Sequence, residues 1–258
     1  YWESLLTVRR ALEADRTAAA YAANCLKASA GKLEEKKRAV RADLGDCKAL
    51  YTKFFEGEVP AEFVFEKGKS YTTRSVLGAV LAYLNKETKG TVLAASADLY
   101  GSTGAGGIAK DFPSGNFNAV SNPLSRRLSA GGICEDGMAA VCTGISAFGR
   151  HIGVSASYGA FLAFEHVAAR LHAIGVQCAR EAGLDPNTFI MFNGHASLPT
   201  GEDGPTHADP QSLQLLQDNF PKGACITATP LEVDEIWPLT VRALSLKPAV
   251  FAPFVVRP

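Results

Sequence analysis

The chain has 258 residues, of which 47% are hydrophobic and 20% charged, and its 26 Lys and Arg residues balance its 26 Asp and Glu residues. This composition is typical of a globular protein with a sizeable core, and the balanced charge gives no electrostatic reason to expect nucleic-acid binding. No apolar stretch approaches the roughly 20 residues of a membrane span, and no signal peptide opens the chain.

The first 70 residues hold 24 of the 52 charged residues, which marks a separate region. Residues 11–20 and 30–40 are rich in alanine and carry charges at helical spacing, which predicts exposed helices that end near Phe54. Residues 57–69 contain Pro60 and Gly68 and are interpreted as a connector. The chain begins at Tyr1 rather than Met, so we expect a fragment, a processed chain or a single domain.

From residue 72 onward, predicted helices alternate with short apolar runs that are typical of buried strands. The strands are expected at 91–95, 117–120, 152–155, 188–192, 224–228 and 249–255, and the helices at 74–84, 136–147, 158–182, 210–216 and 231–244. This alternation predicts an α/β fold with a parallel sheet covered on both faces. Residues 98–107, 158–164 and 195–207 each follow a predicted strand, so we expect them at one edge of the sheet, where ligands gather.

The loop from His195 to His207 concentrates titratable groups between turn residues. It contains two histidines together with Glu202 and Asp203, and Gly201, Gly204 and Pro205 break its backbone. A polar surface loop is the alternative to a functional site. The spacing matches no standard zinc pattern, so no metal is expected, and hydrogen bonding to a hydroxylated or phosphorylated substrate is favoured.

Two further features lie beside predicted strands. Glu135 begins an almost uncharged helix, where it is interpreted either as part of a capping box or as a buried carboxylate that needs a partner. Tyr158, Phe161 and Phe164 recur every third residue, which fits a core stripe or a platform for stacking a flat heterocycle. Glycine-rich residues 101–107 lack the spacing of known phosphate loops and are weak evidence for nucleotide binding.

The six cysteines contain no Cys-x-x-Cys pair, and several lie in apolar runs. We interpret them as buried free thiols of a reducing compartment and expect a cytoplasmic protein. They are Cys25, Cys47, Cys134, Cys142, Cys178 and Cys225.

Four motifs together, in their order and spacing, resemble the pyrimidine-binding middle domain of transketolases. They are Ser96-Ala-Asp-Leu99, Gly132-Ile-Cys-Glu-Asp-Gly-Met138, Tyr158-Gly-Ala-Phe-Leu-Ala-Phe164 and Gly201-Glu-Asp-Gly-Pro-Thr-His207. The resemblance implies an α/β/α sandwich of the thiamine diphosphate-binding type over residues 71–258. Residues 1–70 resemble the helical connector that precedes this domain in the family.

The resemblance also implies a function, because transketolases use thiamine diphosphate to move a two-carbon ketol unit between sugar phosphates in the pentose phosphate pathway. Glu135 then matches the glutamate that binds the pyrimidine N1′, and Phe161 and Phe164 match aromatic positions around that ring. His207 matches the histidine near the reacting carbonyl, and Asp203 matches the aspartate on a substrate hydroxyl. The residues that match the sugar-phosphate cluster are Arg74, Ser102, His195 and Arg257.

Some positions depart from the family pattern. Cys134 stands where an arginine is common, Ala196 where an aspartate is usual, and Val167 where a further aromatic is expected. In the family, a separate domain with a Gly-Asp-Gly motif holds the diphosphate and Mg²⁺, and the printed sequence lacks that motif. We therefore expect a homodimer or split-subunit assembly that supplies this domain from another chain or segment, and no activity from the isolated chain.

Two alternatives stay open at this point. One is a non-catalytic dimerisation or interaction module that keeps the same fold. The other is a different thiamine enzyme, such as a phosphoketolase, a dihydroxyacetone synthase, a 1-deoxyxylulose-5-phosphate synthase or a 2-oxoacid dehydrogenase subunit.

Overall fold

The computed structural model describes residues 1–36, 45–129, 131–194, 196, 201–207 and 212–256, with the backbone alone for 201–203. The chain divides into two units, Tyr1–Asp43 and Leu44–Pro258. No helix in the described part of the chain is both long enough and apolar enough to cross a membrane.

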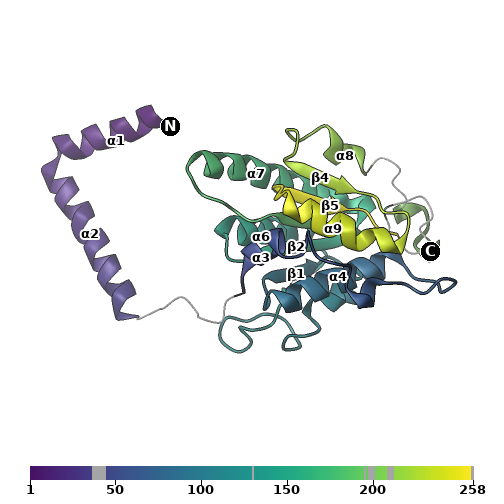
Figure 1. The fold of residues 1–258 in the computed structure, drawn as a ribbon. Coiled ribbons are helices and arrows are strands. Elements are labelled where there is room, and N and C mark those ends of the chain that lie inside the picture. Colours follow the sequence, from purple (N-terminus) through teal and green to yellow (C-terminus); the bar gives the residue numbers. More distant parts are fainter. Residues whose placement is uncertain (37–44, 130, 195, 197–200, 208–211, 257–258) are drawn as a thin grey trace. The chain divides into compact units, whose positions relative to one another are not determined.

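The first unit contains two consecutive helices, α1 (Trp2–Ala14) and α2 (Arg16–Glu35) (Figure 1). Asp15 ends one helix and begins the next, because its extended backbone interrupts α1 and its carboxylate accepts hydrogen bonds from the Thr17 and Ala18 N–H groups. Neither helix buries a residue, so the predicted exposed character is confirmed. The single helix expected over 11–20 is wrong, since the break at Asp15 divides it.

The second unit is built on a sheet of five parallel strands in the order β1-β2-β3-β5-β4. The strands are β1 (Val92–Ser96), β2 (Ile152–Tyr158), β3 (Phe189–Gly194), β4 (Cys225–Ala228) and β5 (Val250–Pro253). The register aligns Ala94 of β1 with Val154 of β2, and Val154 with Ile190 of β3. The α/β class with a parallel sheet is therefore confirmed.

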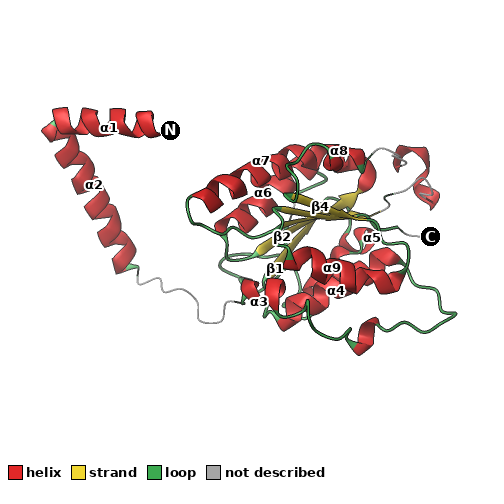
Figure 2. Ribbon diagram, turned by 45° about the horizontal axis from the view of Figure 1, so that its top comes forward, coloured by secondary structure: helices red, strands yellow, loops and turns green. Residues whose placement is uncertain are grey.

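Helices cover both faces of this sheet (Figure 2). One face carries α3 (Cys47–Thr52), α4 (Thr73–Glu87) and α9 (Ile236–Ser245), and the other carries α6 (Glu135–Phe148), α7 (Leu162–Glu181) and α8 (Gln214–Gln217). Successive side chains of β3 join opposite layers, with Ile190 and Phe192 in the first and Phe189 and Met191 in the second. The strands are mostly apolar, and the residues of β1, β2, β3 and β5 are buried on both faces.

The residues just before position 71 belong to this second unit. Phe54 and Phe63 are buried against Trp237 of α9, with ring centroids 6.3 Å and 5.2 Å from the indole, and the Phe63 ring stacks on it. Tyr83 of α4 meets the same indole edge-on at 5.4 Å. The structural unit thus extends further towards the N-terminus than the domain that the sequence led us to expect.

In the second unit, the predicted elements at 117–120 and 158–182 are among those that differ from the structure. The strand expected at 117–120 is wrong, because the Asn118 side chain accepts hydrogen bonds from the N–H groups of Val120 and Ser121 and folds the segment into a turn. The helix expected over 158–182 begins only at Leu162, since Tyr158 is the last residue of β2 and the turn η3 (Gly159–Phe161) separates them.

The glycine-rich segment after β1 is a compact packing element. It forms the short helix α5 (Tyr100–Thr103) and the 3₁₀ turn η2 (Ala105–Ala109), which lies against α4. A Cβ placed on Gly78 of α4 would lie 2.2 Å from the Gly104 carbonyl oxygen, and Gly104 has a φ of 84°. The close approach of the two backbones explains Gly78, and the left-handed backbone conformation explains Gly104, so neither glycine indicates a phosphate site.

Candidate functional site

The carboxyl ends of β1 and β2 are joined by a hydrogen bond. Tyr158, the last residue of β2, donates its hydroxyl proton to Asp98 Oδ2 at 2.6 Å, and Asp98 follows β1. The Tyr158 ring also meets the His207 ring edge-on, with centroids 5.2 Å apart. The prediction that these three chain segments meet at one edge of the sheet is confirmed for the described residues.

His207 is placed by aromatic neighbours on both sides. Its ring lies 5.2 Å from the Phe161 ring as well as from Tyr158, and its Nδ1 is within 2.9 Å of the Thr206 hydroxyl. His207 ends η4 (Gly201–His207), in which Gly204 has a positive φ of 67° that only glycine adopts readily. The structure therefore presents the imidazole at the sheet edge on a glycine-broken turn.

Glu135 lies in the first turn of α6, against the carboxyl end of β2. It is 9% exposed, and Ser157 of β2 donates a hydrogen bond to its Oε1 at 3.1 Å. The residue before it, Cys134, occupies the helix N-cap without a side-chain capping bond, so the capping box considered from the sequence does not form. The expected buried carboxylate with a polar partner is confirmed, and the helix N-terminus stabilises its negative charge.

The aromatic residues expected to line one helix are divided among three elements. Tyr158 ends β2, Phe161 ends η3 and Phe164 lies in α7, so the predicted helical stripe is wrong. Tyr158 is buried, whereas Phe164 is 61% exposed and Val167, one turn further along, is 65% exposed. The exposed ring of Phe164 has a free apolar face, which a flat heterocycle could cover.

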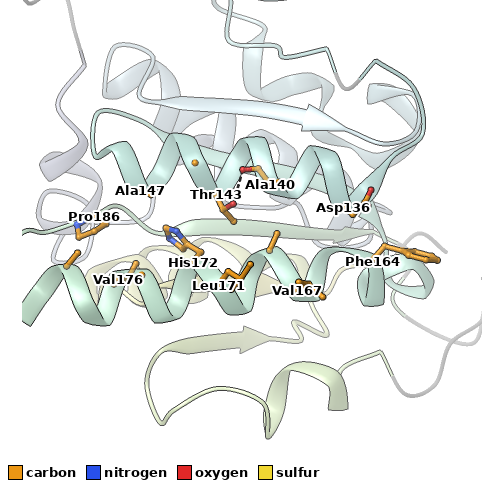
Figure 3. Close-up of a pocket in the computed structure, with 14 residues that line it drawn as sticks. Asp136, Ala140, Thr143, Ala147, Phe164, Val167, Leu171, His172, Val176 and Pro186 are labelled. Carbon is orange, nitrogen blue, oxygen red and sulfur yellow. Dashed lines mark hydrogen bonds between the residues drawn. The ribbon is translucent and has the colours of Figure 1, made fainter. Parts of the chain in front are cut away.

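An apolar groove begins beside Phe164 and runs between α6 and α7 (Figure 3). Its volume is about 460 Å³, and Ala140, Thr143 and Leu171 are among its lining residues. Figure 3 shows Asp136 and Phe164 at one end and Pro186 at the other. The groove therefore connects the start of α6, where Glu135 lies, to a long apolar surface.

Arg74 and Ser102, both predicted to bind a sugar phosphate, are in contact. The Arg74 Nη1 donates a hydrogen bond to the Ser102 carbonyl oxygen. The Arg74 backbone N–H bonds the Val256 carbonyl at 3.3 Å, and an ideal Cβ on Gly194 would lie 3.5 Å from the Arg74 side chain. Arg74 thus lies beside the ends of both β3 and β5.

Three of the sequence-derived candidates are not placed. His195 and Arg257 lie outside the described residues, as does the side chain of Asp203. Among the residues whose side chains are described, no group of three His, Cys, Asp or Glu residues is arranged to hold a metal ion. The thiols are all free, and the prediction that they are buried is wrong for Cys25, Cys134 and Cys178, which are exposed.

One buried acid was missed by the sequence reasoning. Glu165 of α7 is 2% exposed, and Ser155 of β2 donates a hydrogen bond to its Oε2 at 2.5 Å. Burial raises the pKa of this carboxyl to about 8; the Ser155 bond lowers the pKa and the nearby Glu135 charge raises it. The helical spacing of Leu162, Glu165, Ala169 and Val176 places Glu165 on the buried side, and that periodicity could have revealed it.

A family model described as "Transketolase, pyrimidine binding domain" matches residues 69–252. A transketolase from Treponema pallidum is 32% identical over 160 residues, which cover 59% of this chain and 21% of that protein. The chain thus spans about a fifth of the length of this relative.

Solved structures show the same fold. A transketolase from Leishmania mexicana has a TM-score of 0.58 at 22% identity, covering 81% of this chain and 29% of that one. A Pichia stipitis transketolase in complex with sedoheptulose 7-phosphate has a TM-score of 0.62 at 20% identity, covering 81% and 30%. The family match over most of the chain, together with the shared parallel-sheet fold, shows that this chain belongs to the transketolase family, as a pyrimidine-binding domain.

Proposed function

We propose that this chain supplies the pyrimidine-binding half of a transketolase-type site, which transfers a two-carbon ketol unit between sugar phosphates with thiamine diphosphate. The observation that carries this proposal is Glu135, a carboxylate 9% exposed at the head of α6 and hydrogen-bonded by Ser157. A buried carboxylate beside an exposed aromatic ring suits a flat nitrogen heterocycle, because one binds a ring nitrogen and the other covers a ring face. The donor set therefore fits the aminopyrimidine of thiamine.

Each residue of this half-site has a role in the proposal. Glu135 holds a proton at the pyrimidine N1′, and the low local dielectric strengthens that hydrogen bond. Phe161 and Phe164 flank the ring, with the exposed Phe164 as the stacking partner. When bound, thiamine diphosphate supplies the nucleophilic carbon that carries the two-carbon unit.

The opposite part of the edge is assigned to the sugar. His207 lies near the reacting carbonyl oxygen and Asp203 binds a substrate hydroxyl. Arg74, Ser102, His195 and Arg257 hold the phosphate; this assignment is supported by the Arg74 guanidinium, which lies beside Ser102 and the ends of β3 and β5. The sedoheptulose 7-phosphate in the Pichia stipitis transketolase supports a sugar phosphate as ligand.

The other half of the site is a diphosphate-binding domain that holds Mg²⁺, contributed by another chain or another segment in a homodimer or a split-subunit assembly. The exposed apolar residues Phe164, Val167 and Leu171 on α7 support contact with such a domain, because they line the groove that begins at Asp136, the residue after Glu135, and lack cover within the described chain. A cytoplasmic location and a role in the pentose phosphate pathway belong to the same proposal.

The test is reconstitution with a matching diphosphate-binding chain. Turnover of xylulose 5-phosphate and ribose 5-phosphate, with thiamine diphosphate and Mg²⁺, is expected from the mixture and not from either chain alone. Glu135→Gln is expected to lower kcat by about 100-fold or more, since proton transfer contributes on that order. Glu181→Gln, which changes an exposed carboxylate at the end of α7, is the matched control. Partner binding without turnover would assign a non-catalytic interaction role instead, and turnover that does not depend on Glu135 would overturn the role given to that residue.

A further inference from the structure

Two carboxyl groups lie side by side along β2, and the proposed function uses only one of them. Ser155 and Ser157 are two residues apart on the strand, so their side chains point to the same face. Ser157 donates its hydrogen bond to Glu135 of α6, and Ser155 donates its own to Glu165 of α7. Each helix thus brings one glutamate to its own serine.

The two glutamates interact electrostatically. The negative charge of Glu135 is one cause of the raised pKa of Glu165, after the larger effect of burial. Among the described elements in contact with α7, α6 carries the titratable groups that interact with Glu165, namely Glu135 and Cys142, and β2, which supplies Ser155, also contains Tyr158. Elements β3, β5, η3 and α8 contain no Asp, Glu, His, Lys, Arg, Cys or Tyr, and His166 is the neighbour on the same helix.

The Cys142 thiol does not compensate a charge on Glu165. It is fully buried, and it donates a hydrogen bond to the Val154 carbonyl at 3.3 Å. Burial is the main cause that raises its pKa, and the Glu165 carboxylate adds to the effect, so the thiol stays neutral across the physiological range. In the part of the chain that the structure describes, Ser155 is the side chain that hydrogen-bonds Glu165, and no cation pairs with it. A carboxylate buried in this way is costly, whereas the protonated acid is not.

We propose that Glu165 is a positioning residue for Glu135: the two carboxyls form a coupled pair on β2 that carries one negative charge, with the proton on Glu165 and the charge on Glu135. The role of Glu135 towards the pyrimidine rests on the proposed function, but the pairing itself does not. Loss of the Glu165 proton places a second negative charge behind Glu135. That charge repels the charge on Glu135 and changes the field at any group that Glu135 binds, which sets an alkaline limit on the site.

The experiment is an NMR titration of the full chain, without cofactor, carrying ¹³C at the glutamate side-chain carboxyls. One carboxyl is expected to titrate near pH 8 and to be missing from Glu165→Gln. In Glu135→Gln the same signal is expected to titrate lower, by on the order of one pH unit, because the neighbouring charge is gone. In Ser155→Ala it is expected to titrate higher, because the hydrogen bond that lowers the pKa is lost. Glu181→Gln serves as the control that leaves the signal in place.

The outcomes separate the pairing from the enzyme activity. The pairing is overturned if the Glu165 signal titrates in the ordinary carboxyl range, or if it does not move in Glu135→Gln. Either result would stand even if the assembled enzyme is a transketolase. In an active assembly, Glu165→Gln is expected to extend the alkaline limb of the kcat profile to higher pH, and an unchanged limb overturns the positioning role. A purely structural Glu165 would lower the amount of folded protein without moving that limb.

Discussion

The two layers that cover the sheet are built differently. The layer under α3, α4 and α9 is closed by aromatic rings, with Trp237 contacted by Phe54, Phe63 and Tyr83. The layer under α6 and α7 buries two glutamates on two serines, and the outer surface of these helices exposes large apolar side chains. The first layer is closed mainly by aromatic packing, while the second buries carboxyl groups, which is costly, and leaves a surface without cover in the described chain.

The largest effect on stability is expected in the layer under α3, α4 and α9, here called the aromatic layer. Trp237→Ala should lower the free energy of unfolding by about 3–5 kcal/mol, because it removes a large buried ring from three neighbours. Phe148→Ala, at a ring that is 80% exposed on α6, should change it by less than about 0.5 kcal/mol. Chemical denaturation measures both. A similar loss in the two variants would contradict the division between the layers.

The second prediction concerns pH and the glutamate layer. The folded-state pKa of Glu165, about 8, lies well above the ordinary glutamate value of 4.5, so the folded chain binds the extra proton between these values. Its contribution to stability is complete below pH 4.5 and is lost as the pH rises towards 8. Relative to Glu165→Gln, the chain should lose about 3 kcal/mol between pH 5 and pH 7, at about 1.4 kcal/mol per pH unit. Denaturation curves at both pH values give the difference, and parallel pH profiles for the two proteins would rule out the buried acid.

The third prediction tests how closely α6 approaches the sheet. A Cβ on Gly153 of β2 would lie 2.1 Å from the Cys142 carbonyl oxygen, so Gly153→Ala should destabilise the chain by about 1–3 kcal/mol. Gly144→Ala, in α6 with open space around it, should be neutral or stabilise by up to about 1 kcal/mol. Thermal unfolding compares the pair. Equal midpoints would mean that the helix lies further from β2 than the structure shows.

The smallest effect on stability is expected on the outer surface of α7. Leu171 is 64% exposed, so Leu171→Ser should change the free energy of unfolding by less than about 0.5 kcal/mol. The same change should weaken binding of the proposed diphosphate-binding chain by about tenfold, because it removes an apolar contact from the groove. Calorimetric titration measures the affinity, with Leu246→Ser on the exposed end of the other layer as control. Equal losses for both variants would argue against α7 as the contact surface.

Much of the sheet could be predicted from sequence because both faces of its strands are buried, and continuous apolar runs mark such strands. The same signal failed at 117–120, where the Asn118 side chain satisfies backbone N–H groups and makes a turn. It also failed at Tyr158, whose spacing to Phe161 and Phe164 fits a helix. In the structure, Tyr158 pairs with Gly194 of β3, and this pairing extends β2 to residue 158. The local sequence around Tyr158 does not reveal a contact with a strand more than 30 residues away.

The candidate site shows the same limit. Glu135 was found because a carboxylate before an uncharged helix is conspicuous, and the His207 turn because it is dense in titratable groups. Glu165 was missed because it stands beside His166 in an ordinary amphipathic helix. Its burial depends on which side of α7 faces β2, and its partner Ser155 lies ten residues earlier in another element.

The two serines of β2 also bear on how the sheet reaches its correct register. Side chains alternate along a strand, so a shift of β2 by one residue would turn Ser155 and Ser157 towards the aromatic layer. Val154 and Ala156 would then face Glu135 and Glu165, and both carboxyls would be buried without a hydrogen-bond donor. The serines therefore make a misaligned pairing of β2 less stable than the correct one. This matters for the whole sheet, because β2 pairs with a neighbouring strand on each side.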